Sequence, residues 1–64
     1  MKFDIILHLR KKAEKDINRA MREAESGNDL EAAKLFMRAG GTLITLGRGL
    51  ENEINEENSQ FITH

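Results

Sequence analysis

The segment Ser26-Gly27-Asn28-Asp29 divides this chain of 64 residues into two stretches with helical apolar spacing. Gly27 suits the left-handed backbone conformation that ends a helix, and Asn28 suits the N-cap of the next one. Glu31 follows Asn28 by three residues, which is the spacing of a capping box. So short a connection predicts two antiparallel helices that pack as neighbours in one hairpin.

The two expected helices fill most of the chain and define one small all-α domain. We expect the first helix over residues 3–26, where apolar residues recur at spacings of three and four. After a turn at 26–29, we expect the second helix over residues 29–57. The hairpin therefore covers residues 1–57, and residues 58–64 are expected to form a frayed C-terminal tail.

Two apolar stripes run along the expected second helix, although a helix in a simple hairpin needs only one. One stripe consists of Leu30, Ala33, Met37, Gly40, Ile44, Gly47 and Ile54, and the other of Phe36, Ala39, Leu43, Leu46 and Leu50. Two stripes predict two neighbours, namely the first helix and a second copy or another partner. We therefore expect a homodimer that forms a four-helix bundle. The expected dimer surface consists of Ile5, Leu7, Phe36, Leu43, Leu46 and Leu50.

Small residues at a spacing of seven predict a close seam between the two helices of the hairpin. The residues expected to form this seam are Ala13 and Ala20 on the first helix and Ala33, Gly40 and Gly47 on the second. Close packing gives a reason for glycine in a helix interior, where it costs roughly 1 kcal/mol relative to alanine.

The glycines also allow a second interpretation, in which the second helix breaks. Residues 42–46 are then a strand bounded by glycines, and residues 2–9 pair with it. A two-stranded ribbon is only marginally stable, and the chain offers no third strand. We therefore expect the helix to continue.

The middle of the chain resembles the turn of a tetratricopeptide or MIT-type helical hairpin. Within residues 19–39, the matching features are Ala20, Gly27-Asn28, Ala32, Phe36 and Ala39. The chain departs from the tetratricopeptide pattern where charged residues such as Asp16, Arg19 and Glu23 replace large ones. It also has no 34-residue repeat and no third MIT helix. The resemblance implies a helical hairpin that binds a peptide or a protein.

Charge is unevenly distributed, although the net charge is only −1. Residues 1–28 contain seven Lys/Arg and five Asp/Glu, whereas residues 29–64 contain three and six. A basic stripe along the first helix is predicted from the spacing of Lys11, Lys15, Arg19 and Arg22. Such a stripe suits the phosphates of a nucleic acid or an acidic partner. The alternative is a solvated face whose charges pair with Asp16, Glu23 and a partner's acidic residues.

Catalytic and cofactor chemistry find little support in the composition. The chain has no Cys, which excludes disulfides, thiolate metal sites and thiol nucleophiles. His8 and His64 lie at opposite ends, so no metal site is expected. The glycine-rich segments 40–42 and 47–49 lack the lysine and the preceding strand of a phosphate loop. We expect no enzyme activity, no cofactor and no small-molecule substrate.

These observations lead to two expected functions. The first is a non-enzymatic protein–protein interaction module, a small regulator or adaptor that binds itself as a homodimer and binds another protein. Small helical proteins without Cys are often accessory products of phages or mobile elements. The alternative is a small dimeric nucleic-acid-binding regulator that uses the basic stripe. No apolar run approaches a membrane span and the segment 3–9 does not fit a signal peptide, so we expect a cytoplasmic protein without membrane partners.

Overall fold

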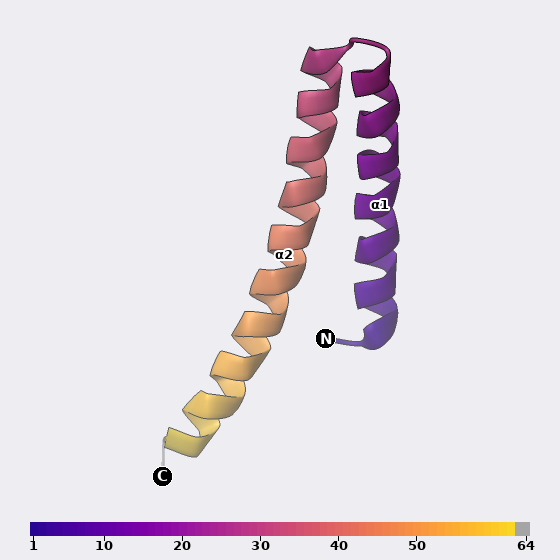
Figure 1. The fold of residues 1–64 in the computed structure, drawn as a ribbon. Helices are drawn as coiled ribbons and strands as arrows, with labels where there is room; N and C mark the ends of the chain where they lie inside the picture. Colours follow the sequence, from indigo (N-terminus) through magenta and orange to yellow (C-terminus); the bar gives the residue numbers. More distant parts are fainter. Residues whose placement is uncertain (63–64) are drawn as a thin grey trace.

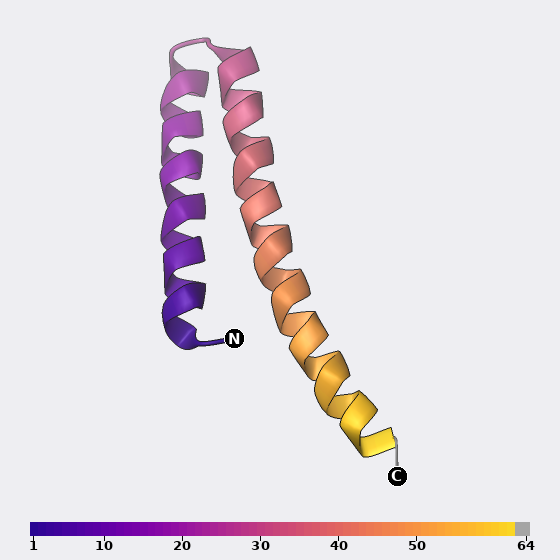
Figure 2. The same cartoon turned by 180° about the vertical axis from the view of Figure 1, so that it is seen from behind.

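Two antiparallel helices make up the fold. The computed structural model describes the backbone of residues 1–62 and the side chains of residues 1–56. Helix α1 (Phe3–Glu25) packs against helix α2 (Asp29–Ile62), and the described residues contain no strand. The end of α1 and the start of α2 lie side by side at the turn, and α2 extends beyond the N-terminal end of α1 (Figures 1 and 2). The predicted all-α hairpin is therefore confirmed.

The turn is a Schellman motif built around Gly27. This glycine has a φ of +83°, the left-handed conformation that lets the chain leave a helix without steric strain from a side chain. The Gly27 N–H donates to the Ala24 carbonyl (3.0 Å), and the Asn28 N–H donates to the Glu23 carbonyl (2.8 Å). These two hydrogen bonds satisfy carbonyls that the end of α1 leaves open.

The capping box expected at the start of α2 is not formed. The Asn28 side chain donates a hydrogen bond back to Glu23 Oε2 (2.9 Å) instead of accepting one from the first turn of α2. The Schellman motif explains this outcome, because it brings Asn28 over the last turn of α1. A polar contact there takes the place of the apolar contact that often accompanies this motif.

Helix α2 continues through all of its glycines, so the strand alternative over 42–46 is not adopted. Two threonines in this region satisfy their hydroxyls inside the helix: Thr42 Oγ1 donates to the Arg38 carbonyl (3.2 Å) and Thr45 Oγ1 to the Gly41 carbonyl (2.9 Å). The helix ends at Ile62 rather than at 57, since no glycine or proline follows Gly49 to stop it.

The C-terminal segment is correspondingly different from the expected tail. Residues 58–62 belong to α2, whereas residues 63–64 lie outside the described part of the chain. The expected frayed tail over 58–64 therefore does not describe residues 58–62.

The core between the helices is small and rich in alanine. Its buried apolar residues are Ala13, Ala20, Ala32, Leu35 and Ala39. On α2 these positions follow spacings of three and four, and half-buried Thr42 and Leu46 continue the same stripe. Spacings of this kind are typical of helices packed side by side as in a coiled coil.

The small residues predicted to line the seam on α2 are not the ones that face α1. Ala33 and Gly47 are exposed, and a side chain built at Gly40 or Gly47 would meet nothing within 4 Å. The prediction was wrong for these three residues because the true stripe includes the polar Thr42, which hides its periodicity. On α1, Ala13 and Ala20 are buried, with exposed fractions of 2% and 0%.

The helices diverge with distance from the turn (Figures 1 and 2). From the turn, the buried apolar residues reach only to Ala13 near the middle of α1 and to Ala39 on α2, and four of the five are alanines. In the far half, larger residues stand between the helices: Ile6 and Leu9 on α1, and Leu46 and Leu50 on α2 are half-buried. The size of the interfacial side chains thus explains the widening. The resulting molecule is elongated, with extents of 58 × 21 × 9 Å.

Candidate interaction surface

A row of exposed apolar residues runs along α2 on the side away from α1. We call this row the outer seam; it consists of Leu30, Ala33, Met37, Gly40, Ile44 and Gly47, with Ile54 further along. Its large side chains are open to solvent, with exposed fractions of 73% for Leu30, 69% for Met37 and 57% for Ile44. The positions repeat at spacings of three and four, which is the spacing of a helix–helix contact.

An apolar flank connects the outer seam to the core. It consists of Phe36, Leu43 and Leu50, which repeat every seven residues. Phe36 and Leu43 are 42% and 47% exposed, whereas Leu50 is half-buried. The core stripe, the flank and the outer seam together leave only one side of α2 polar. Helix α2 therefore has more apolar surface than α1 covers.

The predicted dimer surface is divided between these regions. Phe36, Leu43 and Leu50 form the flank, but Leu46 continues the core stripe towards α1. On α1, Ile5 is 47% exposed and Leu7 is half-buried. Two residues apart, they point about 200° away from each other around the helix, so they do not share one face. The predicted dimer surface therefore combined residues that lie on different faces of the hairpin.

Asp16 is the one charged residue among the buried residues of the described chain, and it joins the two helices. Asp16 is 6% exposed, and its carboxylate accepts two hydrogen bonds from Arg38, from Nε (3.0 Å) and from Nη2 (2.7 Å). The Arg38 hydrogen bonds hold the pKa of Asp16 below its ordinary value. Burial acts in the opposite direction, while the charges of Arg38, Lys12 and Arg19 also lower this pKa.

The basic stripe lies on the exposed side of α1. Lys11, Lys15, Arg19 and Arg22 are all exposed, and none is in an ion pair with a residue that the structure describes. The two carboxylates expected to pair with the stripe hydrogen-bond to other residues, Asp16 to Arg38 and Glu23 to Asn28. A shallow hollow beside the stripe is lined by Lys15, Asp16, Asn18, Arg19, Arg22 and Arg38.

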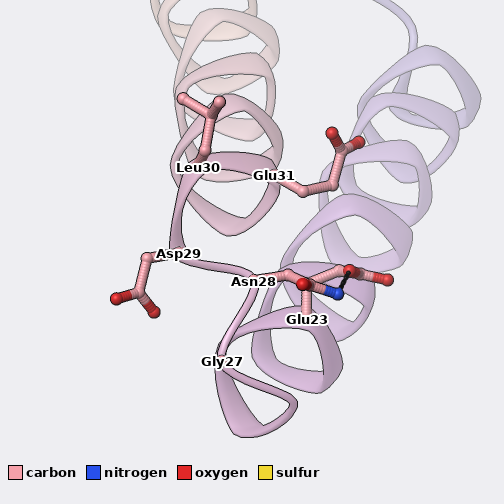
Figure 3. Close-up of a pocket in the computed structure, with 6 residues that line it drawn as sticks. All are labelled: Glu23, Gly27, Asn28, Asp29, Leu30 and Glu31. Carbon is pink, nitrogen blue, oxygen red and sulfur yellow. Dashed lines mark hydrogen bonds between the residues drawn. The ribbon is translucent and has the colours of Figure 1, made fainter.

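A second hollow lies at the turn, and its charge is opposite. Figure 3 shows Glu23, Asp29 and Glu31 around it, with the Asn28 amide bonded to Glu23 and Leu30 pointing outward. Its carboxylates surround the N-terminus of α2, where backbone N–H groups already carry partial positive charge. The helix N-terminus offsets only part of the charge of the three carboxylates, so the hollow is acidic, and it contains no serine, threonine or histidine.

The described residues contain neither a metal-ligand cluster nor a membrane-spanning helix. No cluster of three or more His, Cys, Asp or Glu residues suited to a metal occurs in the described part of the chain. His8 is exposed, and His64 lies outside the described residues. Neither α1 nor α2, over the residues described, has a stretch apolar and long enough to cross a membrane.

The geometry defines a two-helix hairpin with an uncovered apolar face on α2 and a basic face on α1. Comparisons with protein families, with curated proteins and with solved structures find no match to this chain.

Proposed function

We propose that this protein is a non-enzymatic interaction module that associates with itself as a homodimer of four helices and binds another protein. The observation that supports the proposal is the exposure of large apolar side chains on α2. These side chains, each at least 42% exposed, are Leu30, Phe36, Met37, Leu43, Ile44 and Ile54. Contiguous apolar surface of this kind on a small protein marks an interaction site.

The small size of the hairpin core supports the same proposal. Among the described residues only five apolar side chains are buried, and none of the large ones is completely covered. A chain of this length supplies little stability from one core and usually needs metals, disulfides or association. With no Cys available, association is the route that the composition leaves. Burying each large side chain of α2 contributes on the order of 1–2 kcal/mol to it.

Sedimentation equilibrium across the micromolar range tests self-association. The proposal predicts an average mass that rises with concentration from the 7.3 kDa of one chain towards twice that value. A single mass of 7.3 kDa at every concentration would contradict it.

A second candidate function is nucleic-acid binding through the basic stripe. The favouring observation is that the four stripe residues lack ion-pair partners among the described residues. From Lys11 to Arg22 the stripe is about 16 Å long, which is enough to follow a few phosphates. No aromatic residue lies within the stripe to stack on bases, so it suits backbone contacts rather than base recognition.

A further inference from the structure

Large and small residues alternate along the outer seam of α2. The first position of each three-and-four repeat is large, and the second is small: Leu30 then Ala33, Met37 then Gly40, Ile44 then Gly47. We propose that this seam pairs with the same seam of a second copy in antiparallel orientation, so that each large residue packs over a small residue of the partner. The inference rests on the proposed function and specifies its partner surface and geometry.

A two-fold axis between Met37 and Gly40 matches the six seam positions from Leu30 to Gly47, whereas Ile54 lies beyond the overlap of the two α2 helices. Met37 then lies over the partner's Gly40, Ile44 over the partner's Ala33, and Leu30 over the partner's Gly47. Each of the six layers contains one large and one small residue, which is how facing side chains interdigitate at even density. The flank joins the same contact, because Phe36 and the partner's Leu43 come within two residues of each other along the helix axis, or about 3 Å.

The glycines have the space that this packing requires. A side chain built at Gly40 or Gly47 would meet nothing of its own chain within 4 Å. The small residues therefore do not serve contacts within the hairpin, although each of these glycines costs α2 roughly 1 kcal/mol relative to alanine. Close approach of a second helix explains both the open space beside Gly40 and Gly47 and the presence of glycine at these helical positions.

Parallel pairing fits the same residues poorly. It places Met37 against the partner's Met37 and Gly40 against the partner's Gly40, so crowded layers alternate with empty ones. Charge does not distinguish the two orientations. In a parallel pair the exposed Glu51 faces the partner's Glu51. In the antiparallel pair it comes level with the partner's turn, which carries the carboxylates Glu23, Asp29 and Glu31.

The area of the seam sets the expected strength of the dimer. Two α2 helices in this register overlap over residues 29–48, or about 30 Å, with a helix diameter of about 10 Å. The contact strip is thus on the order of 300 Å² per copy, or about 600 Å² in total, below the standard size of a stable interface. We therefore expect a reversible dimer with a Kd in the micromolar range.

Spin labels on two cysteine variants test the orientation, because the chain has no cysteine of its own. Thr45→Cys and Asn52→Cys both place the label on exposed positions of α2, seven residues apart on one polar face. In the antiparallel dimer, the two copies of the label are offset along the helix axis by about 20 Å at position 45 and by about 40 Å at position 52. Pulsed dipolar spectroscopy should therefore give a clearly longer distance for Asn52→Cys.

Equal distances at the two sites would overturn the antiparallel arrangement while leaving self-association intact. A sample with no dipolar coupling and the mass of one chain would overturn the proposed function as well. The two failures are therefore distinguishable in one set of samples.

A pair of substitutions at Gly40 tests the layer packing. Gly40→Ala keeps a small residue in the seam, as Ala33 already does, and should leave the dimer Kd within a few-fold of its original value. Gly40→Leu has similar helix propensity but collides with the partner's Met37, and should weaken the dimer by at least about tenfold. Equal dimer strength in the two variants would overturn the proposed register.

Discussion

Arg38 and Asp16 form a bidentate ion pair across the hairpin, with Arg38 Nε 3.0 Å from Asp16 Oδ2 and Arg38 Nη2 2.7 Å from Asp16 Oδ1. The two residues are 22 positions apart, and this contact connects α1 to α2 in the middle of a stripe made of alanines and one leucine. Alanine packing alone tolerates sliding of one helix along the other. A bidentate pair has one geometry and therefore fixes the register.

Asp16→Asn should destabilise the hairpin, and the loss should depend on pH. The pKa of Asp16 in the folded chain lies below its ordinary value because of the Arg38 hydrogen bonds. Its stabilising contribution is therefore complete above the unfolded pKa of about 4 and is lost as the pH falls through the lower folded pKa. Thermal unfolding followed by circular dichroism should show a gap in Tm between the two proteins that closes under acid.

The matched control for this prediction is Glu14→Gln, which removes an exposed ion pair with Arg10 within α1. Exposed pairs of this kind contribute little, so Tm should barely change. A Tm gap between wild type and Asp16→Asn that stays constant into acid would contradict the assigned role of Asp16.

Ala20→Leu should destabilise the hairpin by about 1–3 kcal/mol, because a larger side chain does not fit where the helices approach most closely. Ala20 has no exposed surface, whereas Ala24, one turn further along α1, is exposed. Ala24→Leu changes the chain in the same chemical way and should leave the free energy of unfolding nearly unchanged. Chemical denaturation of both variants measures the difference, and equal losses would show that the interface is elsewhere.

Gly27→Ala and Gly41→Ala should change stability in opposite directions. At Gly27 the φ of +83° is unfavourable for a residue with a side chain, so alanine should cost about 1–2 kcal/mol. At Gly41 the backbone is helical and the space is open, so alanine should stabilise α2 by about 1 kcal/mol. The midpoints of denaturant unfolding of the two variants measure these changes. An increase in stability for Gly27→Ala would rule out the Schellman turn.

The basic stripe predicts weak, salt-dependent binding to duplex DNA or RNA. Lys15→Glu combined with Arg19→Glu should abolish this binding, since both side chains are exposed and without ion-pair partners in the described chain. Lys2→Glu with Lys34→Glu changes the net charge equally outside the stripe and serves as the control. Fluorescence anisotropy across a salt series measures the affinity. No binding at low salt, or equal losses in both double variants, would eliminate the second candidate function.

The fold could be predicted because its decisive feature is local. Gly27 ends the first helix, and only Asn28 separates it from the start of the second. A connection this short places the two helices antiparallel and side by side, so the hairpin follows from turn chemistry. The excess of apolar surface on α2 was also visible in the sequence, as two stripes where one is sufficient. Both features depend on residue spacing along one helix rather than on contacts between helices.

The assignment of stripes to neighbours could not be predicted from spacing alone. The stripe that faces α1 contains Thr42, and its counterpart on α1 contains Asp16, so neither is continuously apolar. Large apolar residues such as Leu30, Met37 and Ile44 lie in the outer seam, so side-chain size does not identify the stripe that faces α1. The sequence did indicate that Asp16 faces the core. Asp16 follows Ala13 by three residues and precedes Ala20 by four, which is the spacing of the buried residues. Its pairing with Arg38 needs three-dimensional contact and has no sequence signature.

Sedimentation equilibrium on two neighbouring lysine variants tests most directly whether the outer seam is an association surface. Ile44 lies in the seam and is 57% exposed, whereas Thr45 is exposed on the polar face. We predict that wild type and Thr45→Lys both approach twice the 7.3 kDa of one chain at high micromolar concentration, while Ile44→Lys stays at 7.3 kDa with its helix content retained. Equal masses for the two variants, or a wild type that remains at the mass of one chain, would contradict the account.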